Sequence, residues 1–257
     1  MKIQSLSHSQ INTYLKCPAM YFFRYCKKLV IPPKSAMAFG SATHESIRAN
    51  NYQKKTTHTD TKLSVLQDIF EMKIKTTEIA LNNKEGETKE KLIDEGTKKI
   101  IPLYHKELAP QCQPIIVEER IQVKFENAEW VYTGRIDLVN IQENIIDYKC
   151  VGKTPSEKKV LFPDPQLTGY ALCYRQKTGH LPNRTYHNYL IRTKKPKALI
   201  TPEGERTTKD INIYLRLVMY IAEQIEQERF YPNYTSYLCN EQYCGFFPYC
   251  QKEWGSL

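Results

Sequence analysis

The chain has 257 residues, of which 41% are hydrophobic, so it is long enough to bury a substantial core. Its formal net charge of +9 favours a polyanionic partner such as nucleic acid, because clustered lysine and arginine side chains gain affinity by releasing condensed counterions. The sequence contains no run approaching the ~20 apolar residues of a membrane span, and its first residues lack the apolar core of a signal peptide. We therefore expect a cytoplasmic protein with no membrane partner.

The first part of the chain, residues 1–110, is predicted to be mostly helical. Ser7 begins a capping box ahead of an apolar stripe, which predicts a helix that ends near Pro18. A second short helix, rich in aromatic residues, is expected over residues 19–28. Apolar residues at helical spacing predict further helices between residues 36 and 108.

The middle part, residues 111–200, has the alternating pattern of β-strands. Three consecutive strands joined by short turns, a meander, are predicted at 121–125, 130–138 and 145–149. A helix capped by Asp164 and stopped by Gly179 follows, and then a strand over residues 186–193. The pattern predicts a catalytic sheet with one helix following it.

The last part, residues 201–257, is predicted to contain a long helix at about 209–229 and then a tail rich in cysteine and aromatic residues. There is no internal repeat and no linker of low complexity. We therefore expect residues 1–257 to form a single domain.

Acidic and basic residues on two neighbouring predicted strands indicate a catalytic site. Asp137 lies on one strand, and Asp147 and Lys149 lie on the next, where alternation directs both side chains to the same face. Two adjacent carboxylates repel each other unless a cation lies between them, and their hard oxygen ligands suit Mg²⁺ or Mn²⁺. Such a metal, with Lys149 orienting or deprotonating a water molecule, would suit phosphodiester hydrolysis. By itself, an Asp-x-Lys pattern on a strand more often consists of surface residues with no catalytic role.

The eight cysteines are many for a reducing compartment, where grouped thiols more often hold metal than form disulfides. Cys239, Cys244 and Cys250 lie close together, with glycine and proline between them, so a loop can turn three thiolates towards one centre. A fourth ligand is then required. Four other cysteines are interpreted as unligated: Cys26, Cys112, Cys150 and Cys173.

Five motifs occur in an order that is typical of one nuclease family. They are the segment from Ser7 to Cys17-Pro18, the segment Phe39 to Glu45, Gly134-Arg135-Ile136-Asp137, Asp147-Tyr148-Lys149, and Gln166 with Tyr170. On these motifs the chain resembles the PD-(D/E)XK nuclease superfamily, in the branch of RecB-like exonucleases that carry an iron–sulfur cluster. It is similar to the nuclease of CRISPR spacer acquisition and to the AddB nuclease domain.

The resemblance implies an α/β (α+β) fold of the restriction-endonuclease type. A mixed central sheet would be flanked by helices, with a helical N-terminal portion and a C-terminal cysteine cluster joined to the N-terminal helix. It also implies roles for individual residues. His44, Asp137, Asp147 and the backbone carbonyl of Tyr148 would be metal ligands, Lys149 would be the catalytic lysine, and Gln166 and Tyr170 would line the active cleft.

The resemblance further implies that Cys17 joins Cys239, Cys244 and Cys250 around one 4Fe-4S cluster. Many relatives have two residues between the first pair of the C-terminal trio, whereas this chain has four, so structural Zn²⁺ stays an alternative. Cys150 also departs from the Thr or Ser that many relatives have after the lysine.

The leading hypothesis is a metal-dependent exonuclease that acts on DNA ends or single strands in recombination, repair, phage DNA metabolism or CRISPR adaptation. Its partner would be a helicase, a recombinase or a spacer-acquisition complex. The alternatives are a structure-specific endonuclease and a non-catalytic iron–sulfur DNA-binding protein on the same fold. Basic residues expected to contact phosphates are Arg135, Lys194, Lys195 and Lys197.

Overall fold

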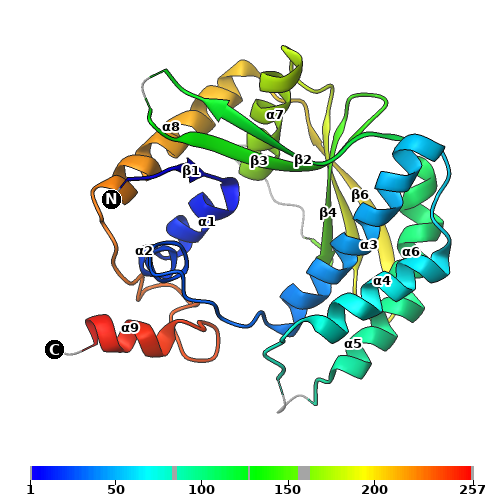
Figure 1. Cartoon of the computed structure of the whole chain (residues 1–257), viewed down its shortest axis with the longest axis horizontal. Helices are drawn as coiled ribbons and strands as arrows, with labels where there is room; N and C mark the ends of the chain where they lie inside the picture. The colour runs from blue at the N-terminus through cyan, green and yellow to red at the C-terminus, as the bar shows by residue number, and fades with distance from the viewer. Residues whose placement is uncertain (1, 83–85, 127, 156–162, 256–257) are drawn as a thin grey trace. The chain divides into compact units, whose positions relative to one another are not determined.

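The computed structural model describes residues 2–82, 86–126, 128–155 and 163–255. The chain divides into two compact units, each assembled from separate stretches of sequence (Figure 1). Unit 1 comprises residues 1–31, 122–134 and 208–257, and unit 2 comprises residues 32–121 and 135–207. Within the described residues, no helix combines the length and the apolar character needed to cross a bilayer.

Unit 1 is built from helices at the two ends of the chain. Its first helix begins after Ser7, whose side chain accepts a hydrogen bond from the backbone amide of Gln10, as the capping box predicted. The side-chain amide of Gln10 instead donates to the backbone carbonyl of Ser5, so the box is not reciprocal. The elements are β1 (Ser5–Leu6), α1 (His8–Lys16), α2 (Pro18–Tyr21), the π-helical turn η1 (Phe22–Cys26), α8 (Thr208–Glu226) and α9 (Phe247–Trp254).

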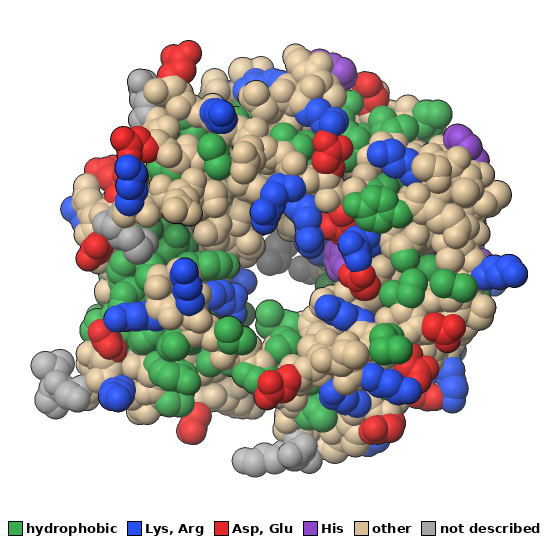
Figure 2. Space-filling view, in the orientation of Figure 1, with side chains coloured by type: hydrophobic (Ala, Val, Ile, Leu, Met, Phe, Trp, Pro, Cys, Tyr) green, Lys and Arg blue, Asp and Glu red, His purple; other side chains and the backbone are tan. Residues whose placement is uncertain are grey.

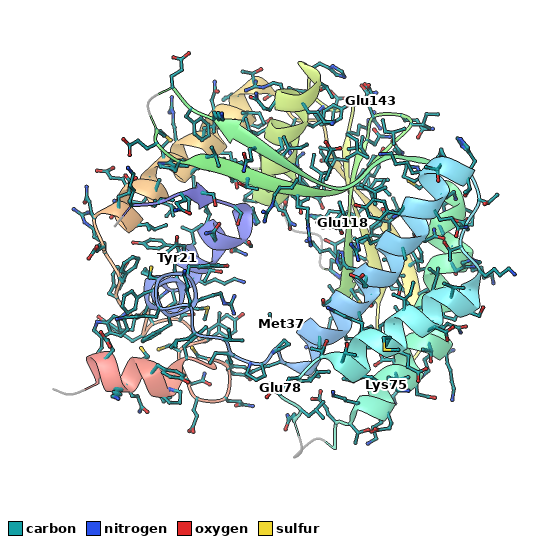
Figure 3. All side chains as sticks on the ribbon, in the orientation of Figure 1. Tyr21, Met37, Lys75, Glu78, Glu118 and Glu143 are labelled. Carbon is teal, nitrogen blue, oxygen red and sulfur yellow. The ribbon has the colours of Figure 1, made fainter. Side chains whose placement is uncertain are left out.

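Aromatic rings connect the N-terminal helices of unit 1 with its C-terminal tail. The ring of Tyr21, labelled in Figure 3, stacks on Phe230 with 6.1 Å between centroids, and Phe23 stacks on Phe246 at 6.0 Å. The hydroxyl of Tyr14 donates to the backbone carbonyl of Arg229 at 2.7 Å. Stacked aromatic pairs add to the free energy gained by burying their area, so these contacts stabilise the attachment of the tail.

Unit 2 has a helical half that packs on one face of its strands. Fully buried rings form the centre of this packing, including Phe39, Phe70 and Tyr104. Tyr104 meets Tyr148 of the sheet edge-on, with 5.8 Å between ring centroids. The helices of this half are α3 (Ser35–Thr57), α4 (Leu63–Thr76), α5 (Lys89–Glu95), η3 (Gly96–Ile100), α6 (Ile101–Leu103), η4 (Tyr104–Leu108) and η5 (Ala109–Gln111). Helix α7 (Pro165–Thr178) is not part of this half, and its Gln166 contacts Asp147 and Lys149.

The strands form a mixed sheet, hydrogen-bonded in the order β1-β3-β4-β5-β6, with β2 also paired to β3. β3 and β4 are antiparallel, β4 and β5 are parallel, and β5 and β6 are antiparallel. β1 pairs in parallel with the start of β3. The longer strands are β2 (Pro114–Lys124), β3 (Val131–Asn140), β4 (Ile145–Val151), β5 (Thr185–Ile191) and β6 (Lys197–Gly204).

Alternation along β4 separates the hydrophobic core from the polar face of the sheet. Ile146 and Tyr148 belong to the core cluster that the helical half of unit 2 covers. Asp147 and Lys149 therefore lie on the opposite face, because successive side chains of a strand point to opposite sides. The core thus fixes the face on which the acidic and basic groups of β4 gather.

The architecture confirms the expected mixed α/β fold with helices flanking a central sheet. The helix capped by Asp164 and ended by Gly179 forms as predicted. Strands β1 and β6 were not predicted, because β1 has only two residues and the exposed β6 lacks a buried apolar face. Helix α9 was also not predicted within the cysteine-rich tail.

We predict that Gly96→Ala lowers the free energy of unfolding by about 1–3 kcal/mol, as overpacking of a filled core does. A β-carbon on Gly96 would overlap the ring of Phe70, which is fully buried and packs edge-on against Phe39. The matched control is Gly40→Ala in α3, where a β-carbon meets no atom within 4 Å. Urea unfolding of both variants tests this, and equal stability of Gly96→Ala and the wild type would contradict it.

Candidate metal and catalytic site

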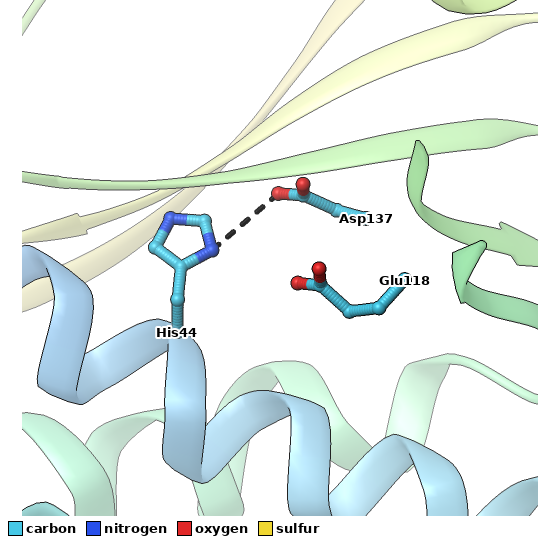
Figure 4. A group of neighbouring side chains, drawn as sticks. All are labelled: His44, Glu118 and Asp137. Carbon is cyan, nitrogen blue, oxygen red and sulfur yellow. Dashed lines mark ion pairs between the residues drawn. The ribbon is translucent and has the colours of Figure 1, made fainter. Parts of the chain in front are cut away.

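Three potential metal ligands from three elements of unit 2 meet beside its sheet. His44 of α3, Glu118 of β2 and Asp137 of β3 each offer one ligand atom, and these atoms lie within 4.8 Å of one another (Figure 4). Nδ1 of His44 is 3.5 Å from Oδ2 of Asp137. We call these three residues the acidic cluster.

The acidic cluster is electrostatically unfavourable without a cation. Burial raises the pKa of Asp137 well above its usual range, and the nearby carboxylates of Asp147 and Glu118 raise it further. Burial also raises the pKa of Glu118 and lowers the pKa of His44. Each group thus favours its neutral form, whereas a bound divalent cation would favour ionised carboxylates and a neutral imidazole. Two oxygen donors and one nitrogen donor at this spacing therefore fit a divalent metal.

Glu118 is a site residue that the sequence analysis missed. Its backbone has a φ of 48°, in the left-handed region that non-glycine residues seldom adopt, and this occurs in the middle of β2. Nε of Arg135 is 2.8 Å from Oε2 of Glu118, so Arg135 partly balances the charge of the cluster. The available signal was the pair of glutamates at 118 and 119, which lie between the apolar run 115–117 and the strand predicted at 121–125. Figure 3 labels Glu118 in the context of its strand.

Asp147 lies next to the acidic cluster but is bonded to different partners. Its side chain is 1% exposed, and its two oxygens are contacted by donors of three residues. Nζ of Lys149 and Nδ1 of His187 reach Oδ2 at 2.7 and 3.0 Å, and Nε2 of Gln166 reaches Oδ1 at 3.0 Å. Asp147 is not one of the three residues whose ligand atoms lie within 4.8 Å of one another, and its predicted role as a ligand together with Asp137 stays a prediction.

The backbone of Tyr148 joins Asp147 to the acidic cluster. Its amide donates to Oδ2 of Asp137 at 3.3 Å. A hydrogen bond between His44 and the Tyr148 backbone counteracts the lowering of the His44 pKa by burial. The peptide predicted to supply a carbonyl ligand thus lies in direct contact with His44 and Asp137.

A hydrogen-bonded chain positions the amine of Lys149. Nζ of Lys149 donates to Oε1 of Gln166 at 2.7 Å, and Nε2 of Gln166 donates to the hydroxyl of Tyr170 at 2.9 Å. Gln166 and Tyr170 share one face of α7 because they are four residues apart. Burial raises the pKa of Tyr170, and the charges of Asp137 and Asp147 add to this effect, so its hydroxyl stays neutral. The structure brings together the three residues that the motifs predicted.

His187 and Asp164 also belong to this region, and the sequence analysis gave neither a role in the site. Nδ1 of His187 contacts Asp147, and its Nε2 is 3.6 Å from Oδ2 of Asp164, the N-cap residue of α7. Burial alone would lower the pKa of His187, but the bonds to both carboxylates outweigh it and raise the pKa to about 9. The available sequence signal was a histidine within a predicted strand.

The basic residues predicted to contact phosphates are all exposed. Arg135, with a side chain 68% exposed, touches the acidic cluster through Glu118. Lys194 and Lys195 follow β5, and Lys197 begins β6. Lysine and arginine side chains are interspersed with acidic ones on the face shown in Figure 2, so surface charge alone does not define a path for nucleic acid.

The four cysteines predicted as cluster ligands line one pocket of unit 1. They are Cys17, Cys239, Cys244 and Cys250. Burial raises the pKa of Cys250 to about 11, and the three other thiols contribute to the rise. The thiol of Cys17 also accepts a hydrogen bond from the backbone amide of Asn233 at 3.4 Å. Four sulfur donors facing one apolar pocket fit a thiolate-bound metal or cluster.

Comparison with known proteins identifies the family to which these motifs belong. The profile of the PD-(D/E)XK nuclease superfamily matches residues 5–251. The chain belongs to this superfamily. Its members are nucleases that use divalent metal ions, in agreement with the acidic cluster of unit 2.

Two solved structures resemble this nuclease. A candidate exonuclease from Eubacterium rectale is similar over 97% of this chain and 88% of its own, with 14% identity and a TM-score of 0.61, which shows a shared fold. The structure of SSO0001 matches with 11% identity and a TM-score of 0.44, over 98% of this chain and 88% of its own. The comparison with curated proteins found no significant match.

We predict that Asp137→Asn stabilises the metal-free nuclease and removes the stabilisation that Mn²⁺ gives the wild type. The folded protein disfavours the ionised form of Asp137, and an amide removes this cost; a shift of one pKa unit corresponds to about 1.4 kcal/mol. This is on the order of 3–6 °C in melting temperature for a protein of this size. Thermal unfolding in EDTA and in Mn²⁺ provides the measurement. An undiminished Mn²⁺ effect in the variant would exclude Asp137 as a ligand.

Proposed function

We propose that the chain is a Mg²⁺- or Mn²⁺-dependent deoxyribonuclease that acts as an exonuclease on DNA ends or single strands. The observation that carries this proposal is the adjacency of the acidic cluster to the chain of bonds from Lys149 to Gln166 and Asp147. One part offers ligands for a cation, and the other offers a fixed amine. Phosphodiester hydrolysis requires both functions.

His44, Glu118 and Asp137 would hold the metal, with Asp147 and the carbonyl of Tyr148 as further proposed ligands. When bound, the ion would polarise a phosphoryl oxygen and lower the pKa of a water molecule. The mixed donor set favours Mn²⁺ over Mg²⁺, because an imidazole suits a softer ion better than it suits Mg²⁺. We therefore expect activity with both ions and a lower half-saturating concentration for Mn²⁺.

Lys149 would act on the attacking water or on the charge that develops on the phosphate. Its amine is held by Gln166 and Asp147, so little conformational freedom has to be lost when substrate arrives. The hydroxyl of Tyr170 keeps the Gln166 amide in the orientation that presents its oxygen to Lys149. Tyr170 would thus support catalysis mainly by maintaining this geometry.

DNA would approach along exposed basic groups near the site. Arg135 is suited to a phosphate contact, because its guanidinium is exposed and lies beside Glu118 of the acidic cluster. Lys194, Lys195 and Lys197 would add contacts that raise affinity without selecting sequence. A helicase, recombinase or spacer-acquisition partner would supply the DNA end in repair, recombination, phage DNA metabolism or CRISPR adaptation.

The same chemistry also serves endonucleases, so the choice of substrate distinguishes the two reactions. End-labelled linear DNA, single strands and closed circular DNA are incubated with Mg²⁺ or Mn²⁺. An exonuclease degrades the linear substrates progressively and leaves covalently closed circles intact. Cleavage of the circles would replace the exonuclease proposal with that of a structure-specific endonuclease.

We predict that Lys149→Ala lowers the rate of cleavage by about 100-fold or more, within the range that general acid–base groups contribute. The metal ligands stay in place, so Mn²⁺ should still raise the melting temperature of the variant. The matched control is Lys99→Ala, which changes an exposed lysine of η3 in the same unit. Cleavage by Lys149→Ala at the wild-type rate would refute the assignment, and absence of binding and cleavage in all proteins would favour a different function.

We further propose that Cys17, Cys239, Cys244 and Cys250 hold one 4Fe-4S cluster, with structural Zn²⁺ as the alternative. The shared pocket of the four residues supports a common ligand. The bound metal would be held by thiolates, the form of cysteine that ligates metals. The bound group would serve as a structural cross-link between the helix α1 region and the tail.

The proposed cross-link has a large expected effect on stability, because Cys17 and the three other ligands are more than 200 residues apart in sequence. By analogy with loop closure by a disulfide, joining such distant residues could contribute ~5 kcal/mol. Aromatic contacts such as Tyr21 with Phe230 attach the same two segments, so the tail has a second source of stability. Because the four cysteines all belong to unit 1, loss of the metal would destabilise unit 1 more than unit 2.

We predict that Cys17→Ala lowers both the iron content and the melting temperature of protein purified without oxygen. Cys173→Ala is the control, since that cysteine is fully buried in α7 of the other unit and should leave the iron content unchanged. Metal analysis and the visible absorption spectrum provide the readout. Colourless protein with one Zn²⁺ per chain would replace the cluster with zinc, and metal-free wild-type protein would refute both.

A further inference from the structure

His187 of β5 lies on the same face of the sheet as Asp147, between the carboxylates of Asp147 and Asp164. In the parallel pairing of β4 with β5, His187 lies directly beside Asp147. It is only 4% exposed, and Nδ1 is 3.0 Å from Oδ2 of Asp147. On the other side of the ring, Nε2 is 3.6 Å from Oδ2 of Asp164. The imidazole therefore connects the catalytic strand to the start of α7.

Asp164 determines where α7 begins. Its Oδ1 accepts the backbone amide of Leu167 at 2.9 Å, which caps the helix, while Oδ2 faces His187. The backbone carbonyl of Asp164 accepts the amide and the hydroxyl of Thr168. The two carboxylate oxygens thus have separate functions, one within the helix and one towards β5.

These contacts close a ring of interactions, and two members of the ring, Asp147 and Gln166, hold the Lys149 amine. From Asp147 the ring passes through His187 to Asp164, then along the first turn of α7 to Gln166, and back to Asp147. Gln166 also accepts a hydrogen bond from the Lys149 ammonium group. A ring of this kind resists separation of α7 from β4, because moving the helix would break two contacts at once.

We propose that His187 is a positioning residue of the nuclease site, which fixes α7 against Asp147 through Asp164 so that Gln166 holds Lys149 in place. The proposal rests on the proposed nuclease function. His187 itself touches neither the acidic cluster nor Lys149 in these contacts. Its effect should therefore fall on the turnover rate, as removal of an outer residue that orients a ligand typically costs about 10- to 100-fold.

Two single substitutions and their combination separate the His187–Asp164 contact from the rest of the ring. His187→Asn retains a donor near the position of Nδ1 but cannot reach Asp164. Asp164→Asn removes the charge that faces His187 and preserves the helix cap, because Asn and Asp are equally good N-cap residues. The matched control is His180→Asn, which breaks an exposed histidine–carboxylate pair with Glu143 of the same unit.

Turnover, substrate KM, Mn²⁺ affinity and melting temperature are measured for all variants. We expect kcat to fall about tenfold or more in each single variant, and the double variant to be no slower than the slower single one, because both remove the same contact. KM and Mn²⁺ affinity should stay near wild type, while hydrogen exchange in the first turn of α7 should increase. His180→Asn should match the wild type in every measurement.

Independent effects of the two substitutions would overturn the proposal, as would a fall in melting temperature with unchanged kcat. If His187→Asn does not fold, Asp164→Asn decides alone, and wild-type kcat in that variant would also overturn it. Wild-type protein and Lys149→Ala are assayed alongside. Failure of the wild type to cleave DNA would count against the nuclease function, whereas the α7 hydrogen exchange would still report on the His187 contact.

Discussion

Crowding of buried carboxylates is the interaction on which the site depends. Asp137 and Asp147 lie on neighbouring strands and repel each other, and Glu118 adds a third acid. The protein balances this repulsion in one way at Asp147 and in another at the acidic cluster. Asp147 is surrounded by donors from Lys149, Gln166 and His187, so its charge is balanced within the chain. The acidic cluster has fewer donors, chiefly Arg135 and the Tyr148 amide, and therefore retains the capacity to bind a cation. The number of donors around each carboxylate thus distinguishes Asp147 from the acids of the cluster.

The hydrophobic core and the site are opposite faces of the same strand. Tyr148 is buried against Tyr104, and this packing fixes the peptide that contacts His44 and Asp137. Because strand residues alternate, a shift of one residue in the β4 register would exchange the core and polar faces. The apolar residues of β4 consequently contribute to the chemistry, although they touch neither metal nor substrate. A close-packed core also limits movement of the peptide, since small changes in volume are felt throughout it.

The sequence predicted those parts of the fold that depend on local pattern. The helix between Asp164 and Gly179 has both its cap and its stop in the sequence, and the strand carrying Asp147 and Lys149 alternates clearly. Motif spacing also predicted the proximity of Lys149, Gln166 and Tyr170. Glu118 and His187 were missed because their importance comes from pairing across strands, which a single sequence does not specify. The positive φ of Glu118 likewise arises from tertiary structure, since glutamate has no preference for that conformation. Edge strand β6 was missed because its residues are too exposed to show a buried face.

The composition of unit 1 has a consequence for folding during protein synthesis. Tyr14 of α1 and Tyr21 of α2 contact Phe230, and Phe23 of η1 contacts Phe246. A ribosome adds residues from the N-terminus, so these helices are made long before their partners exist. Both segments of unit 2, residues 32–121 and 135–207, are encoded between the first and last segments of unit 1, and unit 2 has its own buried core. The core of unit 2 can form before the C-terminal residues that pack against α1 and α2 have been synthesised. For most of its synthesis the nascent chain therefore contains α1 and α2 without the C-terminal aromatic residues that they contact in the folded protein.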